Sequence, residues 1–433
     1  MPAAQAIRAF ELPELFREVP DRWTIEPLRN VAKFTTGWTP PTGDDSSYDG
    51  EQLWANISDL KTKFIGDTAK TISDAAALRS RIAVSPIGSL LFSFKLSIGH
   101  VAIVSREMYT NEAIATFKDT KSLSMAFAYY ALPIWLVQNA NENIYGAKLL
   151  NAQLMRAAKV AVPPRDEQRQ IAEYLDRETG KIDELITKQE QLVERLDERR
   201  QSVISLTVCM GLKGPDSANT RNNWFPVIPR GWKAGAVKHY TLRITDGAHI
   251  SPDTDGGVYD FVSTKDVTPD GIYFDGALKT TPETYEYMVR TGCRPGLGDV
   301  LLSKDGTIGR TTVVVDDRDF VVASSLIIIS PDASRLNSMF LNYLFQTSPV
   351  QEQIRSFVKG AGLPRLSIAN LLRVTGLIPS IEEQVEIVNY LDREMAAIRA
   401  LVESAKSVTL LLRERRAALV SAAVTGKIDV RGL

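Results

Sequence analysis

Two stretches of the chain carry apolar residues at heptad spacing, which predicts two long helices. Each stretch follows a proline boundary, Pro163-Pro164 or Pro379, and continues for roughly 45 residues almost without helix breakers, or about 65 Å. A seven-residue repeat with two apolar positions is typical of a coiled-coil seam. The residues predicted to form its core are Ile171, Leu175, Ile182, Leu185, Leu192 and Leu196 in the first helix, and Ile387, Leu391, Ile398, Leu401, Val408 and Leu412 in the second.

The two heptad patterns also share their polar interruptions. Glu178 and Arg199 in the first helix recur as Glu394 and Arg415 in the second. Polar positions in an apolar seam usually fix its register. Both apolar stripes are removed from water if the two helices of the same chain pair with each other. Because a whole globular domain connects the helices, we predict an antiparallel coiled coil with the globular parts at opposite ends.

The regions outside the helices have a mixed pattern. Short β-rich runs alternate with Gly and Pro turn clusters from about Asp21 to Lys159 and from about Asn223 to Arg373. One helix is expected in each region, near Ser124 to Asn143 and near Ser338 to Val358. The predicted fold class is α+β. Two mixed α/β domains occupy residues 1–160 and 213–376, and the long helices occupy 161–212 and 377–433.

An internal repeat relates the two halves. At an offset of about 210 residues Trp23 lies over Trp232, Ser93 over Ser303 and Gly99 over Gly309. At an offset of 216, VPPRDEQRQIAEYLDRE from Val162 lies over IPSIEEQVEIVNYLDRE from Ile378. One duplicated unit predicts a pseudo-two-fold molecule, which suits a partner such as duplex DNA with two half-sites.

Composition limits the function. Lys and Arg number 51 and Asp and Glu 52, so the charge gives no support to a strongly basic, free-standing DNA binder, and a partner must supply much of any phosphate affinity. Cys209 and Cys293 lack disulfide or metal-ligand spacing, and we interpret both as inert. The longest apolar run, Phe320 to Ile329, is too short to span a bilayer. We expect a cytoplasmic protein.

Catalytic motifs are missing from the sequence. It contains no GxxxxGK[ST], no GxGxxG after a strand, no NPPY-type tetrapeptide and no HExxH, and its three histidines lack metal-ligand spacing. The nearest nuclease-like motif is Asp59-Leu60-Lys61. Its counterpart in the repeat, Asp266, has no lysine two places on, which favours a structural role for Asp59. The sequence therefore predicts neither catalysis nor a metal site.

On these residues the chain resembles the DNA-specificity subunits of type I restriction-modification enzymes, over essentially its full length. The resemblance lies in Trp23 and Trp232, in a GDxLxS-like strand at Gly298 to Ser303, and in the P-x-x-EQ start of each long helix, together with Arg199-Arg200, Arg415-Arg416 and the closing AAVTGKID from Ala422. Two departures are the degenerate end of the first helix, LTVCMGLKG, and the turn Phe94-Lys95-Leu96-Ser97, which lacks the glycine of Lys304-Asp305-Gly306-Thr307.

The resemblance implies a protein without chemistry of its own. It would read a bipartite asymmetric DNA site, one half per domain, while the paired helices set the unread gap. It would dock two modification subunits, which are adenine methyltransferases, and through them restriction subunits. The chain would bind no cofactor, because S-adenosylmethionine, ATP and Mg belong to those partners.

Basic loop residues are the candidates for DNA contact, because phosphate contacts come from Lys and Arg and base reading needs side chains that reach a groove. They are Lys61, Lys63, Lys95, His100 and Lys148 in the first domain, and Lys304, Arg310, Lys359 and Arg365 in the second. Two other functions remain open at this point. One is a coiled-coil scaffold that binds proteins through its globular ends, and the other is a self-contained nuclease.

Overall fold

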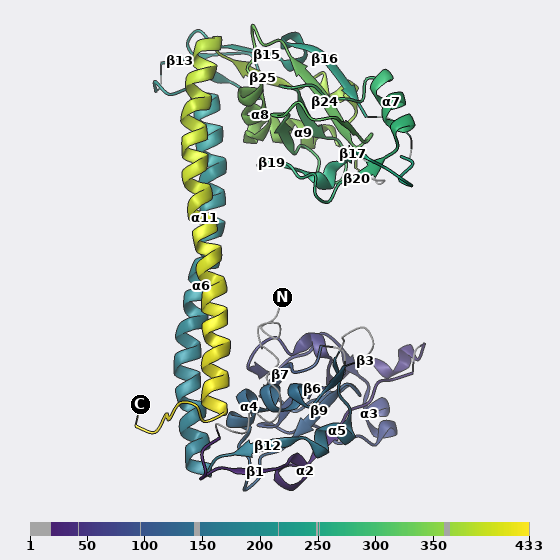
Figure 1. Ribbon diagram of the computed structural model, residues 1–433, viewed down its shortest axis with the longest axis vertical. Coiled ribbons are helices and arrows are strands. Elements are labelled where there is room, and N and C mark those ends of the chain that lie inside the picture. The colour runs from purple at the N-terminus through teal and green to yellow at the C-terminus, as the bar shows by residue number, and fades with distance from the viewer. Residues whose placement is uncertain are drawn as a thin grey trace. The chain divides into compact units, whose positions relative to one another are not determined.

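The computed structural model describes residues 19–41, 43–95, 97–142, 148–214, 216–247, 250, 252–358 and 364–432. The chain divides into two compact units. The first comprises Met1–Glu190 and Lys406–Leu433, and the second comprises Gln191–Ala405. Each unit holds one mixed α/β domain and a segment of each long helix (Figure 1).

The domain of the first unit is built around a five-stranded sheet in the order β2-β9-β6-β7-β4, with a three-stranded sheet β5-β3-β8 and the pairs β1-β12 and β10-β11. Its strands are β1 Thr24–Pro27, β2 Phe34–Thr36, β3 Tyr48–Ala55, β4 Phe64–Ile65, β5 Thr71–Ile72, β6 Leu90–Ser93, β7 Val101–Val104, β8 Tyr109–Thr110, β9 Ile114–Phe117, β10 Asn141–Glu142, β11 Lys148–Leu149 and β12 Lys159–Val162. Its helices are α2 Leu28–Val31, α3 Asp74–Ser80, α4 Met125–Gln138 and α5 Ala152–Ala157, with the 3₁₀ turns η2 Asp45–Ser47 and η3 Ile57–Asp59.

The domain of the second unit has a four-stranded sheet β16-β24-β21-β22, a three-stranded sheet β20-β17-β23 and the pairs β15-β25, β18-β19 and β13-β14. Its strands are β13 Ser217–Asn219, β14 Val227–Pro229, β15 Lys233–Ala236, β16 Thr241–Asp246, β17 Tyr259–Val262, β18 Val267–Thr268, β19 Gly271–Ile272, β20 Leu278–Thr280, β21 Val300–Ser303, β22 Thr311–Val313, β23 Phe320–Val322, β24 Leu326–Pro331 and β25 Thr375–Ile378. Its helices are α7 Pro282–Arg290, α8 Ser338–Gln346, α9 Ser348–Phe357 and α10 Ile368–Leu371, with η4 Val237–Tyr240 and η5 Thr264–Asp266.

The register of the strands shows the internal repeat directly. In the first domain Phe117 pairs with both Phe34 and Leu90. In the second, Ile329 pairs with both Ile244 and Val300. The pairs β1-β12 and β15-β25 are equivalent in the same way. The structure therefore confirms two mixed α/β domains and gives residue-by-residue equivalences between them.

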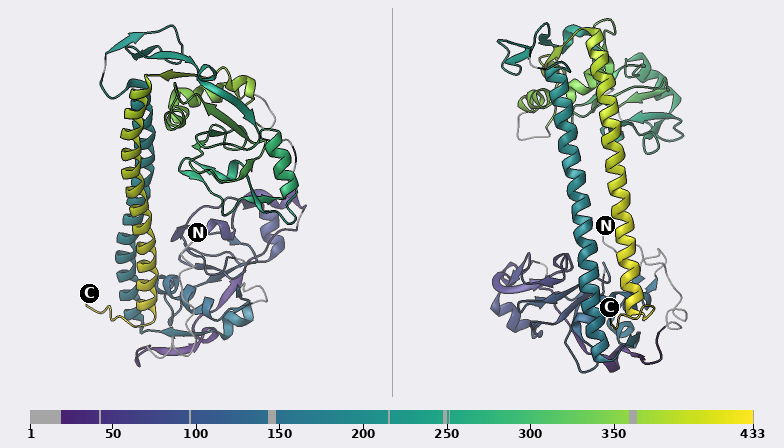
Figure 2. Two further views of the ribbon diagram at one scale, coloured as in Figure 1. Left: turned by 45° about the horizontal axis from the view of Figure 1, so that its top comes forward. Right: turned by 90° about the vertical axis from the view of Figure 1, so that its left-hand side faces the viewer.

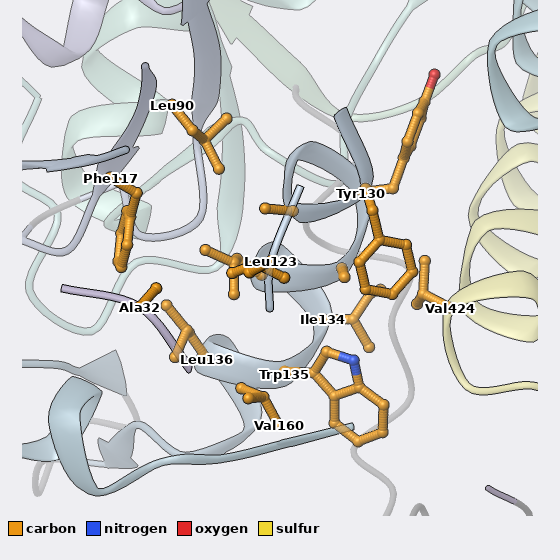
Figure 3. Close-up of a cluster of buried hydrophobic side chains, with 14 of the residues drawn as sticks. Ala32, Leu90, Phe117, Leu123, Tyr130, Ile134, Trp135, Leu136, Val160 and Val424 are labelled. Carbon is orange, nitrogen blue, oxygen red and sulfur yellow. The ribbon is translucent and has the colours of Figure 1, made fainter. Parts of the chain in front are cut away.

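Helix α4 fills the core of the first domain. It is apolar nearly all round, as a helix buried on most sides must be. Figure 3 shows Leu136 of this helix on the side of Ala32 and Phe117, and Tyr130 and Ile134 on the side of Val424 from the last long helix. One hydrophobic core thus joins the domain to a segment of that helix.

The two predicted long helices are present. Helix α6 runs from Arg165 to Met210, and helix α11 runs from Ile381 to Val424. Among the described residues, no helix combines the length and the apolar composition needed to cross a membrane.

A fully buried glutamine in the first turn of each long helix joins that helix to its domain. The amide nitrogen of Gln168 donates to the carbonyls of Ser122 and Pro163 at 2.7 and 2.9 Å, and its oxygen accepts from the Ser124 N–H at 2.8 Å. In the second unit Gln384 donates to the carbonyls of Arg335 and Pro379 at 2.9 and 3.1 Å, and accepts from the Asn337 N–H at 2.8 Å. Because Ser124 and Asn337 cap helices α4 and α8, this glutamine joint fixes a domain helix to a long helix.

A tyrosine–aspartate pair repeats about two turns further along each long helix. The Tyr130 hydroxyl donates to Asp176 at 2.6 Å, and the Tyr343 hydroxyl donates to Asp392 at 2.7 Å. Burial, reinforced by the carboxylate, raises the pKa of both tyrosines, so they stay protonated donors at neutral pH. The leucine and the aspartate of the repeated YLDRE sequence are explained by these contacts and by the full burial of Leu175 and Leu391.

A glycine that packs close to a tryptophan follows each long helix. Gly211 has φ +72°, and a Cβ there would lie 3.1 Å from the Trp232 ring. Gly426 has φ +77°, and a Cβ there would lie 2.2 Å from Pro20 and 3.5 Å from Trp23. The left-handed conformation and the close approach both require glycine. The end of the first helix, divergent in sequence, therefore retains the residue that its geometry needs.

Segments of the two long helices lie side by side within each unit (Figure 2). In the first unit Ile171 and Leu175 share a core with Val420 and Val424. Asp183 pairs with Arg416 at 2.8 Å and Glu190 with Arg413 at 2.9 Å, so the segments run in opposite directions there. In the second unit, the shared core contains Leu196 and Ile204 of α6 with Ile387, Leu391 and Ile398 of α11.

The predicted core of the helices is only partly buried. Seven residues are buried, namely Ile171, Leu175, Ile182, Leu196, Ile387, Leu391 and Ile398, and Leu412 is half-buried. The prediction is wrong for Leu185, Leu192, Leu401 and Val408, which are 46%, 42%, 55% and 38% exposed. Most of the buried positions also belong to a domain core. Heptad spacing identifies an apolar stripe, but burial requires neighbours on several sides.

We expect that Gln168→Ala lowers the free energy of unfolding of the first unit by about 2 kcal/mol, because it removes a fully buried amide that bonds two carbonyls and one N–H. Gln384→Ala should do the same in the second unit. Urea denaturation followed by circular dichroism measures the change. Gln170→Ala, on the exposed side of the same helix, is the matched control. If Gln168→Ala and Gln170→Ala lower the free energy of unfolding equally, the stabilising role of the glutamine joint is wrong.

Candidate nucleic-acid interface

The turns between β6 and β7 and between β21 and β22 are built alike. Ser93 is fully buried, and its hydroxyl donates to the Ser97 carbonyl and accepts from the His100 N–H. Ser303 makes the same two bonds, to the Thr307 carbonyl and from the Arg310 N–H. Gly99 and Gly309 close the turns at φ +92° and +87°. The serines and glycines matched in the sequence are therefore the frame of one turn.

The side chains at the tips of these turns differ between the domains. Lys95 is exposed. Its equivalent, Asp305, forms an ion pair with Arg365 at 2.8 Å. Phe94 and its equivalent Lys304 are both 4% exposed. The Lys304 ammonium pairs with Asp246 on β16, so its side chain occupies a core position. Its predicted DNA contact therefore has no support from its placement.

The other candidates in the first domain fall into two groups. Lys61 and Lys148 are exposed, and within the part of the chain that the structure describes, neither they nor Lys95 form an ion pair. Lys63 instead pairs with Asp176 of α6 and lies 5.2 Å from the ring centres of both Tyr129 and Tyr130. It anchors its loop to the long helix. His100 is half-buried where β7 begins.

Most candidates in the second domain are held by the fold. The Arg310 guanidinium donates to the Val267 carbonyl at 3.0 Å, and Arg365 is bound to Asp305. Lys359 lies outside the described residues. Among the candidates that the structure describes, Lys61, Lys95 and Lys148 are thus the exposed cations without an ion pair. Contact of any of these residues with DNA stays a prediction.

The nuclease-like aspartate has a structural role. Asp59 accepts from the Asn56 N–H at 2.8 Å, and its equivalent Asp266 accepts from the Ser263 N–H at 2.9 Å. Both close a capping box on a 3₁₀ turn. The interpretation of Asp59 as a fold residue is confirmed. Among the described residues, no group of three metal-binding side chains gathers.

The cysteines are not poised for chemistry. Burial raises the pKa of the Cys209 thiol to about 11, so the thiolate is scarce at neutral pH. Cys293 is 2% exposed.

Sequence comparison identifies the family. Residues 20–195 and 248–405 match the type I restriction modification DNA specificity domain. The chain belongs to this family. The two matched stretches correspond to the two copies of the repeat, each with part of a long helix.

Relatives and solved structures agree with this assignment. The chain is 24% identical over 315 residues to the type I restriction enzyme EcoBI specificity subunit of Escherichia coli, covering 70% of this chain and 66% of that one. It is 21% identical over 188 residues to the MjaIX specificity subunit of Methanocaldococcus jannaschii, covering 41% and 43%. The match thus spans less than two thirds of either relative.

Two solved structures share the fold at 16% identity. A chain from a study of complex assembly and conformational transition of the type I restriction-modification system has a TM-score of 0.70, covering 95% of this chain and 99% of that one. The HsdS subunit from Thermoanaerobacter tengcongensis has a TM-score of 0.50, covering 95% and 98%. At this identity the likeness concerns the fold alone.

We expect Lys304→Ala to destabilise the second unit by about 3 kcal/mol, because it removes the buried ammonium that pairs with Asp246 and opens a gap in the core. Lys304→Phe combined with Asp246→Thr introduces the residues of the first domain and should restore most of that stability. Thermal unfolding measures both. If Lys304→Ala unfolds at the wild-type temperature and weakens DNA binding, Lys304 is a DNA contact and the structural role is wrong.

Proposed function

We propose that this chain reads a bipartite, asymmetric DNA site, one half per domain, as the recognition subunit of a type I restriction-modification complex. The observation that carries the proposal is the pair of turns. Their frame of serine and glycine is the same in both domains, whereas the tips present Lys95 in one and Asp305 in the other. A shared frame with different tips lets two copies of one domain read different bases.

The long helices have the properties of a spacer. We propose that they pair along their whole length as an antiparallel coiled coil that sets the unread gap between the half-sites. The ion pairs Asp183–Arg416 and Glu190–Arg413, with the shared cores of each unit, support this pairing. The glutamine joints add support, because they fix each domain to a long helix.

Helix α11 also offers a docking surface. Val408, Leu410 and Leu411 are 38%, 59% and 63% exposed within the first unit. A cluster of exposed apolar side chains on a helix is typical of a surface that a partner covers. We assign it to a modification subunit. Two such subunits, each an adenine methyltransferase using S-adenosylmethionine, and restriction subunits using ATP and Mg, would supply the chemistry that this chain leaves to them.

The two other functions are less well supported. A self-contained nuclease needs a free carboxylate pair, and Asp59 is bound in a capping box. A coiled-coil scaffold that binds only proteins would not need tips that differ within identical frames. Protection of two separate DNA patches by the complex would rule out the scaffold.

Methylation of host DNA tests the reading function. We expect a bipartite adenine-methylated motif that disappears when the chain is deleted. Lys95→Asp should alter one half of that motif, and Asp305→Lys the other, because each tip belongs to one domain. Sequencing that detects methyladenine measures the motif. Methyl transfer from labelled S-adenosylmethionine by the purified chain alone, or a change of both halves by either variant, would contradict the proposal.

The docking surface is tested separately. Leu410→Glu with Leu411→Glu should abolish co-purification of the modification subunit, because two carboxylates would have to be buried at the interface. The chain itself should unfold at the wild-type temperature, since both positions are exposed. Gln170→Glu with Thr187→Glu adds the same charge at exposed positions of helix α6 and is the control. If both double variants lose co-purification of the modification subunit equally, the loss is caused by the added charge and the apolar contact is not supported.

A further inference from the structure

The first domain contains a cavity that the predicted DNA contacts do not include. Its volume is about 620 Å³, and it lies between the segment of α2 and β2 and the segment that follows β9. The lining residues are Arg29, Asn30, Val31, Ala32, Lys33, Phe34, Thr35, Thr116, Lys118, Thr120, Lys121 and Ser122. This volume is in the range of small-molecule sites in proteins.

Four cations line this cavity without a counter-charge. Arg29, Lys33, Lys118 and Lys121 are exposed, and in the described ranges of the chain none of them forms an ion pair. A fifth, Arg156, lies 5.1 Å from the centre of the Phe34 ring. Like charges held close together repel one another, and an anion among them relieves that repulsion. The chain as a whole has a formal net charge of −1, so this local excess is not a general property of its surface.

The second domain provides an internal control. Phe117 is equivalent to Ile329, so Lys118 corresponds to Ser330. The glutamine joints bind the carbonyls of Ser122 and Arg335, so the preceding residue, Lys121, corresponds to Ser334. The same fold therefore forms with serine at both positions. The two lysines are not needed for folding.

The third cation, Lys33, has different neighbours from its equivalent in the second domain. Lys33 corresponds to Arg243, whose guanidinium pairs with the buried Asp299 at 3.3 Å. In the first domain the position of Asp299 is taken by Ser89, whose buried hydroxyl has no hydrogen-bond partner among the described residues. In the second domain a buried aspartate neutralises the cation at this position, whereas in the first domain Lys33 forms no ion pair with any described residue.

We propose that the cavity binds phosphate groups. Lysine ammonium groups act as point charges toward phosphate, and Arg29 adds a forked donor. Thr35 and Ser122 offer hydroxyls at the same surface, whereas the Thr120 hydroxyl already donates to the Val31 carbonyl at 3.0 Å. The phosphates come either from the backbone of duplex DNA outside the bases that are read or from a free polyphosphate. The site does not depend on which bases the domain reads.

The double variant Lys118→Ser with Lys121→Ser tests the proposal in the full chain. It introduces the residues that the second domain carries at these positions, so folding is expected to be unaffected. The control is Lys70→Ser with Arg106→Ser, which removes two exposed positive charges elsewhere in the same domain. Inorganic tripolyphosphate is the first probe, measured by titration calorimetry and by the shift in the unfolding temperature.

A duplex of about 40 base pairs is the second probe, with affinity measured at several salt concentrations. The slope of log affinity against log salt is negative, and its magnitude should fall by about 0.9 for each DNA phosphate that the protein no longer neutralises. If the backbone of DNA is the source, the double variant reduces this magnitude by about 2 and the control leaves it unchanged. If a free polyphosphate is the source, the affinity of the double variant for tripolyphosphate falls at least tenfold with the slope unchanged. Equal behaviour of the double variant and the control with both probes would overturn the proposal.

Discussion

One buried side-chain amide in each unit fixes the start of a domain helix to the first turn of a long helix. Gln168 and Gln384 are fully buried, and each uses both amide atoms to satisfy two carbonyls and one N–H where a domain helix begins. A buried polar group is costly without partners, so this arrangement tolerates few alternatives. Tyrosine–aspartate bonds continue the attachment along the helix, from Tyr130 to Asp176 and from Tyr343 to Asp392. These contacts fix the position of each domain on the long helix that it joins.

The two domains share the bonds of their turns and capping boxes but differ in other side chains on the same backbone positions. The turn serines and glycines make the same bonds in both copies, and both aspartates of the capping boxes do so too. Variation reaches even the core, where the ion pair of Lys304 with Asp246 stands in the place that Phe94 fills in the first domain. A duplicated protein of this kind contains its own comparison. The serines, glycines and capping aspartates present in both copies serve the fold, whereas a charge present in one copy either pairs within its domain, as Lys304 does, or stays without an ion pair among the described residues, as Lys118 does.

Charge in this chain is arranged locally. Acidic and basic residues nearly balance over the whole sequence, yet four cations that form no ion pair with any described residue gather at one cavity of the first domain. The second domain replaces two of them by serine and neutralises a third with Asp299. Several of the lysines and arginines that a sequence suggests for DNA contact are bound by carboxylates or carbonyls. The fold therefore decides which cations stay available for a phosphate ligand.

The sequence by itself determined the architecture. Heptad spacing predicted α6 and α11, and the offset repeat predicted two equivalent mixed domains, because apolar periodicity and duplication are properties of residue order. The repeat also identified Asp59 as a fold residue. Tertiary structure decided which apolar heptad residues are buried, since Leu401 and Val408 need neighbours that spacing cannot supply. It also decided that Lys304 is internal and that Lys33 and Lys118 meet at one cavity. Such facts depend on distances between side chains from separate strands, and strand register, which only the folded chain fixes, sets those distances.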